Sequence, residues 1–234
     1  MMRCAIAGSP GGGKSTLFSR LVAELGRRRG VLVRSNGSSG VRGGGSKGIF
    51  TPGSIRCARV AVSRGFMGSK GCDWTIYDAP GLADDVQSSP AQRKATAEVI
   101  RLLLVCDAIV HVIDASRVGQ LGGERGLTEV DSALHDLVHR ADWNRLASSN
   151  GNGTGGALQQ WKGLFRRVLA PNSGARRSRR PPDYIMVASK MDLPWAQVGR
   201  DELGKRFPDM EVVPLSAGRG EGARLTSWFL GESR

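Results

Sequence analysis

The chain has 234 residues and a formal net charge of +13. This length suits one α/β domain over residues 1–234, which is long enough to bury a substantial core. No uninterrupted apolar stretch approaches the roughly 20 residues of a membrane span, and the first residues enter an expected strand without the pattern of a signal peptide. We therefore expect a cytoplasmic protein with no transmembrane segment.

The first expected elements are a strand, a glycine-rich loop and a helix. The apolar run 4–7 precedes the segment from Gly8 to Thr16, which reads GSPGGGKST, and residues 17–25 have the apolar spacing of a helix. The segment fills the pattern G-x-x-x-x-G-K-[ST] at every fixed position. The flanking strand and helix disfavour the alternative of a glycine-rich turn that carries an accidental lysine.

A loop of this kind binds polyphosphate. Its glycines allow backbone conformations that place successive N–H groups around the phosphates, and the helix N-terminus adds a partial positive charge. We expect Lys14 to reach the terminal phosphates and Ser15 to hold a magnesium ion. The expected phosphate-binding residues are Ser9, Pro10, Gly11, Gly12, Gly13, Lys14, Ser15 and Thr16.

The rest of the chain alternates between expected strands and helices. A loop over 27–48, dense in Gly, Ser and Arg and interpreted as mobile, leads to a hairpin of strands at 55–63 and 74–77. The later strands are expected at 108–113, 184–188 and 211–215, and the helices at 90–105, 124–140, 196–206 and 222–230. This alternation predicts an α/β fold with a doubly wound, mainly parallel six-stranded sheet, helices on both faces, and ligands outside the carboxyl ends of the strands.

The composition shifts to Asn, Gly, Ser and Arg over residues 148–182, which we interpret as an insertion within the single domain. One amphipathic segment, 158–169, lies inside it. Its apolar stripe either packs on its own domain or forms a partner site, and the first alternative is the commoner one.

A second polar segment follows the expected strand at 74–77. In the sequence Asp78-Ala79-Pro80-Gly81, the aspartate can hold a water on magnesium, and the Gly81 N–H can reach a γ-phosphate. A D-x-x-G segment by itself is a weak signal. Its place at the carboxyl end of a strand beside the phosphate loop strengthens it.

Two further segments follow the last two strands. In Ser189-Lys190-Met191-Asp192, the aspartate can accept from both N1–H and the exocyclic amine of guanine, while the lysine stem packs along the ring. In Ser216, Ala217 and Gly218, the Ala217 N–H can meet guanine O6. Either segment alone would more often be an ordinary surface loop.

In this order and spacing, the four segments resemble the first, third, fourth and fifth motifs of the translation-factor class of P-loop GTPases, and within it the Era, Der, Obg and TrmE group. The resemblance covers nearly the whole chain. It implies binding of GTP and GDP with Mg²⁺ at Ser15 and Asp78, and hydrolysis of GTP as a molecular switch. It also implies a switch threonine before the second strand, for which Thr51 is the candidate, with Lys14, Thr51 and Gly81 as the catalytic set.

Three positions depart from that pattern. Gly11 replaces an asparagine that helps to hold potassium in some members, so potassium stimulation is doubtful. Ser189 replaces an asparagine that ties the fourth motif to the phosphate loop, which predicts a weaker tie. Leu82 stands at the place of a water-positioning glutamine, and a leucine cannot orient water, so slow intrinsic hydrolysis is expected.

Arginine clusters at 27–29, 166–167 and 176–180 contribute to the positive charge. They favour a polyanionic partner such as RNA, the ribosome or an acidic membrane surface. Arginine-rich codon usage in a high-GC genome explains them about as well. The protein effector of such a switch is unknown from the sequence.

Two other classes of function stay open. One is an ATP-using P-loop enzyme, against which Asp192 and the Ser216 loop stand. The other is a nucleotide-binding interaction protein with negligible hydrolysis, for which Leu82 is the argument. The three histidines, including the helically spaced His135 and His139, lack the accompanying glutamate of a zinc-protease pattern and are given no functional role.

Overall fold

The computed structural model describes residues 1–28, 31–36, 55–62, 73–82, 90–139, 182–216 and 223–230. Its strands form one seven-stranded sheet in the order β2-β3-β4-β1-β5-β6-β7. The strands are β1 (Met2–Ala7), β2 (Val31–Asn36), β3 (Arg56–Val62), β4 (Trp74–Asp78), β5 (Ala108–Asp114), β6 (Asp183–Ser189) and β7 (Val212–Pro214). Neighbouring strands are parallel from β4 to β7, whereas β3 is antiparallel to both β2 and β4.

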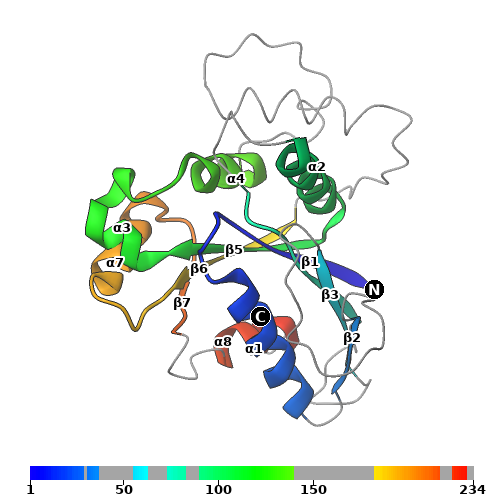
Figure 1. The fold of residues 1–234 in the computed structure, drawn as a ribbon. Helices are drawn as coiled ribbons and strands as arrows, with labels where there is room; N and C mark the ends of the chain where they lie inside the picture. The colour runs from blue at the N-terminus through cyan, green and yellow to red at the C-terminus, as the bar shows by residue number, and fades with distance from the viewer. Residues whose placement is uncertain are drawn as a thin grey trace, which may run out of the picture.

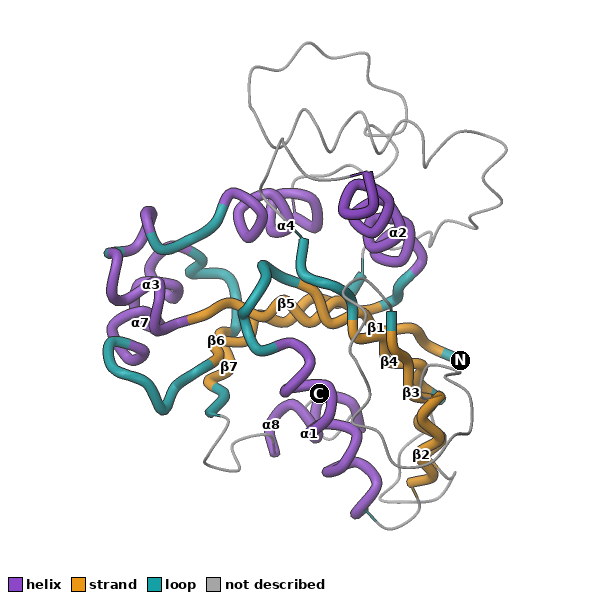
Figure 2. Tube along the Cα trace, in the orientation of Figure 1, coloured by secondary structure: helices purple, strands orange, loops and turns teal. Residues whose placement is uncertain are grey.

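Helices cover both faces of this sheet (Figure 1). On one face lie α1 (Lys14–Arg27) and α8 (Ala223–Leu230), and on the other lie α2 (Pro90–Val105) and α4 (Glu129–His139). The helices α3 (Ala115–Leu121) and α7 (Ala196–Arg206) pack on each other at one end of the sheet, next to the 3₁₀ helix η1 (Gly123–Arg125). Figure 2 shows the strands as the central layer between these helices.

The core follows from this sandwich. Leu17, Leu21 and Leu25, spaced for one helix face, pack from α1 against the sheet together with Phe229 of α8. A second cluster joins α2 and α4 to the other face. Because helices cover both faces, the central strand β5 is buried along its first six residues, as its nearly continuous apolar run predicts.

The sheet has one strand more than the six expected. Residues 31–36 were interpreted as part of a mobile loop, but they form β2 at the edge of the sheet, paired antiparallel with β3. Val31 and Val33 pack against the core, while Leu32 and Arg34 between and after them are exposed. This short alternation is a strand pattern that the surrounding Gly, Ser and Arg residues concealed.

The expected start of the helix at 124–140 is also wrong. The chain forms α3 and η1 first, and α4 begins only at Glu129. Gly122 and Gly123 have φ of +76° and +38°, which interrupt the helical path between α3 and η1. At the start of α4, Thr128 Oγ1 accepts from the Asp131 N–H at 3.0 Å while Asp131 Oδ2 accepts from the Thr128 N–H at 3.4 Å, a reciprocal cap of a helix start.

The remaining elements agree closely with the expected ranges; α7 spans the expected 196–206. The proposed insertion at 148–182, with its amphipathic segment 158–169, lies outside the described residues apart from Pro182. In the described part of the chain, no helix is long and apolar enough to cross a membrane.

Candidate nucleotide site

The loop between β1 and α1 has the backbone that its glycines predict. Gly8, Gly11 and Gly13 have φ of +142°, +74° and +91°, and a Cβ at Gly8 would stand 2.3 Å from the Val112 carbonyl oxygen. Gly13 precedes α1 without a side-chain cap, so the first-turn N–H groups of that helix point out of its end. Such an end is a binding site for phosphate.

Lys14 is held inside this loop. Its side chain is only 6% exposed, and Nζ donates to the Ser9 carbonyl at 2.5 Å. Burial lowers the pKa of Lys14, and the negative charges of Asp78 and Asp131 oppose that shift in part. A buried ammonium has lost part of its hydration. A phosphate anion that contacts it stabilises the charged form, because the anion replaces the lost water.

The Asp78 segment lies directly against the phosphate loop. Parallel pairing sets Ile6 opposite Asp78, and the Leu82 N–H donates to the Gly8 carbonyl at 3.2 Å. A Cβ on Gly81 would stand 2.7 Å from the Pro10 Cα, so only glycine fits this approach. The sequence-predicted neighbours therefore meet at the carboxyl ends of β1 and β4.

Asp78 itself is 4% exposed, and its two oxygens differ. Oδ2 accepts from Arg56, whereas Oδ1 has no hydrogen-bond partner within the described residues. A buried carboxylate oxygen with no partner fits a metal-bound water. The hydroxyl of Ser15, exposed at the first turn of α1, supplies a second oxygen of the type that Mg²⁺ prefers.

In the described ranges, no group of three or more His, Cys, Asp or Glu side chains could hold a metal ion.

Two residues that were expected to bear on hydrolysis differ in what the structure says of them. Thr51, the candidate switch threonine, lies outside the described residues. Leu82 is fully buried within the core cluster of α2 and α4. An apolar side chain in that place packs in the protein interior and has no polar group that could orient a water molecule.

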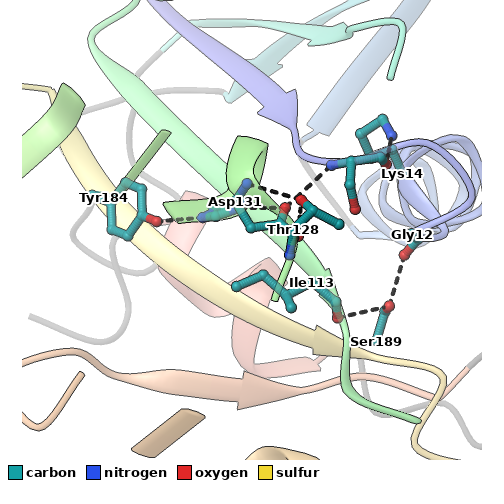
Figure 3. A network of polar contacts seen from close by, with 9 residues as sticks. Gly12, Lys14, Ile113, Thr128, Asp131, Tyr184 and Ser189 are labelled. Carbon is teal, nitrogen blue, oxygen red and sulfur yellow. Dashed lines mark hydrogen bonds and ion pairs between the residues drawn. The ribbon is translucent and has the colours of Figure 1, made fainter. Parts of the chain in front are cut away.

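The fourth motif contacts the phosphate loop through Ser189. Its Oγ lies 2.7 Å from the Gly12 carbonyl and 2.9 Å from the Ile113 carbonyl, and Figure 3 shows it between the two. The hydroxyl has one proton, so it donates to the two carbonyls alternately or through one hydrogen bond shared between them. Ser189 therefore ties the fourth motif to the phosphate loop directly, and the strength of this tie relative to an asparagine at this position stays a prediction.

The next residues are the candidates for recognition of the base. Lys190, at φ +60°, donates from Nζ to Asp114 Oδ2 at 2.5 Å, which fixes its stem along the carboxyl ends of β5 and β6. Asp192 is exposed and accepts from Ser216 Oγ at 3.3 Å. Ala217 and Gly218 lie outside the described residues.

Sequence reasoning missed two residues that hold these loops. Arg20 of α1 donates from Nη1 to the Ser216 carbonyl at 2.6 Å, 196 positions away. Asp114 receives Lys190 and also caps α3, where it accepts from the Arg117 N–H at 3.2 Å. An aspartate at the end of a buried strand was a signal for Asp114, whereas Arg20 resembles any exposed helical arginine in sequence.

A buried polar network supports the phosphate loop from below (Figure 3). Asp131 Oδ1 accepts from the Ser9 N–H at 3.3 Å and lies 3.1 Å from His111 Nε2, while His111 Nδ1 lies 2.5 Å from the Tyr184 hydroxyl. One imidazole can contact both groups, because each of its ring nitrogens either donates or accepts a hydrogen bond. A histidine within an apolar strand was the signal, because a buried polar side chain needs a partner.

The network determines the charge of Asp131. Burial raises its pKa, but the hydrogen bond and charge of His111 and the hydrogen bonds of Thr128 and of the Ser9 N–H outweigh that effect, so the net pKa lies below the ordinary 3.8. Asp131 is therefore a fixed anion near Lys14. It balances the buried ammonium and holds the Ser9 backbone.

No protein-family model and no curated protein matches the chain. Among solved structures, the chain is similar to Era in complex with MgGDPNP and a segment of 16S ribosomal RNA, with a TM-score of 0.50 and 19% identity, over 98% of this chain and 56% of that chain. It is also similar to translation elongation factor SelB from Methanococcus maripaludis with a GTP analogue, with a TM-score of 0.48 and 14% identity, over 98% and 33% of the two chains. For the FeoB G-domain from Methanococcus jannaschii the TM-score is 0.45 and the identity 16%, over 99% and 96%.

The likeness to Era concerns the fold, because the identity is low. Together with the sheet order and the loop after β1, it shows that this chain has the fold of P-loop GTPase G domains, as the sequence motifs predict. The chain spans 56% of the length of the Era chain.

Proposed function

We propose that this chain binds GTP and GDP with Mg²⁺ and hydrolyses GTP slowly, as a molecular switch. One observation carries the proposal: Ser189 joins the base-recognition segment to the phosphate loop at Gly12, and Asp192 of the same segment is held by Ser216. A nucleotide that binds the loop through its phosphates is thereby offered a carboxylate for its base. The carboxylate accepts from the N1–H and amine of guanine, a donor pair that adenine lacks.

Each residue has a role in this proposal. The N–H groups of Gly11 to Thr16 and the Lys14 ammonium bind the phosphates, and Gly81 brings an N–H beside Pro10. Ser15 and Asp78 hold Mg²⁺, with Thr51 closing on it in the triphosphate state. Magnesium, when bound with the nucleotide, neutralises phosphate charge. Lys190 packs its stem along the base plane, and Ala217 and Gly218 complete the loop around guanine.

Hydrolysis is proposed to be slow because Leu82 is buried and offers no polar group to water. This observation also supports the second candidate, a nucleotide-binding interaction protein with negligible hydrolysis. The two candidates share the binding site and differ only in turnover. An ATP-using enzyme is disfavoured by the position of Asp192.

Ribosome or RNA association is a further part of the proposal. Arg27, whose side chain is 76% exposed, belongs to the first arginine cluster, and the Era structure holds a ribosomal RNA segment. A cationic cluster on a nucleotide switch favours a polyanion. The cytoplasm is the compartment in which we expect these partners.

Titration of the purified chain with fluorescent GTP, GDP and ATP analogues in Mg²⁺ tests the proposal, followed by single-turnover hydrolysis with and without ribosomes. We expect guanine-selective binding and slow hydrolysis that ribosomes accelerate. Selectivity for ATP would contradict the role of Asp192. Guanine-selective binding with no turnover under any condition would favour the interaction protein.

A further inference from the structure

Arg56 forms an ion pair with the buried aspartate of the candidate magnesium site. It is the first residue of β3, and antiparallel pairing sets it opposite Asp78. Its Nε donates to Asp78 Oδ2 at 2.9 Å, and Nη2 contacts the same oxygen. The pair is well enclosed, with side-chain exposures of 25% for Arg56 and 4% for Asp78.

The guanidinium also lies over an aromatic ring. Its Cζ lies 5.1 Å from the ring centroid of Phe18 on α1, within the range of a cation–π contact. Phe18 is 6% exposed, so the ring is a fixed wall. Arg56 is therefore anchored between the phosphate-loop helix and the Asp78 carboxylate.

The two oxygens of the Asp78 carboxylate differ in their partners. Arg56 occupies Oδ2, and Oδ1 stays without a partner in the described chain. Arginine is charged at all ordinary pH values, so it neutralises Asp78 permanently. A fixed positive charge beside the carboxylate repels a divalent cation and reduces the negative charge that attracts it, and both effects act in one direction.

We propose that Arg56 is a built-in counter-cation of Asp78 that lowers the Mg²⁺ affinity of the nucleotide site. The inference rests on the proposed binding of Mg²⁺ and guanine nucleotide. Its consequence is a nucleotide complex that loosens as Mg²⁺ falls, so that GDP leaves faster at a given Mg²⁺ concentration than it would without the arginine. Arg56 is a positioning residue in this account, since it acts on the metal through Asp78.

The test measures release of fluorescent GDP from the full chain across a range of Mg²⁺ concentrations, a readout that does not depend on hydrolysis. Arg56→Gln removes the charge but keeps an N–H donor for Oδ2, which preserves the buried hydrogen bond. Arg56→Lys keeps the charge. Arg59→Gln, at an exposed arginine of the same strand, controls for the loss of one positive charge from the protein.

We expect the Mg²⁺ concentration for half-maximal slowing of GDP release to fall about tenfold in Arg56→Gln. It should stay within about twofold of the unchanged protein in Arg56→Lys and Arg59→Gln, because the local charge is kept in both. If Arg56→Gln does not fold, Arg56→Lys provides the test. A tenfold change in its Mg²⁺ midpoint for GDP release would overturn the proposal that the charge of Arg56 sets the Mg²⁺ affinity, and an unchanged midpoint would support it.

The two hypotheses fail in different ways. If the unchanged protein binds no guanine nucleotide at any Mg²⁺ concentration, the proposed function is wrong and this inference falls with it. If nucleotide binds but Arg56→Gln has the same or a higher Mg²⁺ midpoint, the nucleotide site stands and the counter-cation is wrong. An equal fall in Arg59→Gln would also overturn it, because the effect would then be one of net charge.

Discussion

The backbone N–H of Ser9 donates to the carboxylate of Asp131, 122 residues further along the chain, at 3.3 Å. The contact joins the second residue of the phosphate loop to the first turn of α4. The same carboxylate binds His111 and Thr128, so one buried anion organises the phosphate loop, a central strand and a helix start.

Replacing Asp131 with asparagine should lower the free energy of unfolding by about 1–3 kcal/mol at pH 7. Asparagine keeps the shape but loses the charge that accepts from three partners, and its amide brings donors to a place that needs acceptors. Denaturant unfolding of both proteins measures the difference. Asp136→Asn, on the outer part of the same helix and half-buried, is the control and should change stability less.

The effect of Asp131 should depend on pH in a defined direction. Its pKa in the folded protein lies below the ordinary 3.8, so the charged form stabilises the fold above that value. The stability contributed by the charge is lost as pH falls from about 3.8 through the lower folded pKa. The difference between the two proteins should therefore shrink as pH falls below about 4. A difference that grows on acidification would contradict this account.

Lys14→Ala should abolish binding of fluorescent GTP and GDP, with a loss of at least about 100-fold, or roughly 3 kcal/mol. The lysine is buried in the loop, where its ammonium is placed to contact phosphate. Lys205→Ala, at a side chain that is 73% exposed on α7, is the matched control and should bind normally. Normal nucleotide binding by a folded Lys14→Ala protein would contradict the assignment of this loop as the phosphate site.

Asp192→Asn should weaken binding of guanine nucleotides and allow xanthine nucleotides to bind. The amide can donate to the carbonyl that xanthine carries in place of the guanine amine, whereas the carboxylate repels it. Competition between GTP and xanthosine triphosphate for the bound fluorescent nucleotide gives the ratio of affinities, which we expect to fall by about 100-fold or more. Asp201→Asn on the exposed side of α7 should leave the ratio unchanged.

Gly199→Ala should destabilise the fold by about 2–4 kcal/mol, measured by denaturant unfolding. A Cβ at Gly199 would stand 1.8 Å from the Ala115 carbonyl oxygen, so the close contact of α7 with α3 would have to open. Gly204 on the same helix has no atom within 4 Å of its Cβ position. Gly204→Ala should raise stability by about 0.5–1 kcal/mol through helix propensity, and a loss at that position would contradict the description of α7.

Local sequence patterns were enough to predict the phosphate loop and most of the strands and helices. The fixed residues from Gly8 to Thr16 predicted the phosphate loop, and alternating apolar runs predicted the order of strands and helices. The placement of Asp78, Ser189 and Ser216 after strands predicted one shared edge, because parallel strands end together. The edge strand β2 was not predicted, because its six residues lie among glycines and arginines and are too few for a clear alternation of apolar and polar side chains.

Long-range packing places further side chains at the sheet edge where the motifs lie. Arg20 reaches Ser216, Arg56 pairs with Asp78, and Asp131 holds Ser9, each through contacts far apart in sequence. Strand register and helix packing bring these partners together, and a one-residue change of register would separate them. Local spacing thus specifies the phosphate and base motifs themselves, whereas the charges that surround them are fixed by long-range packing.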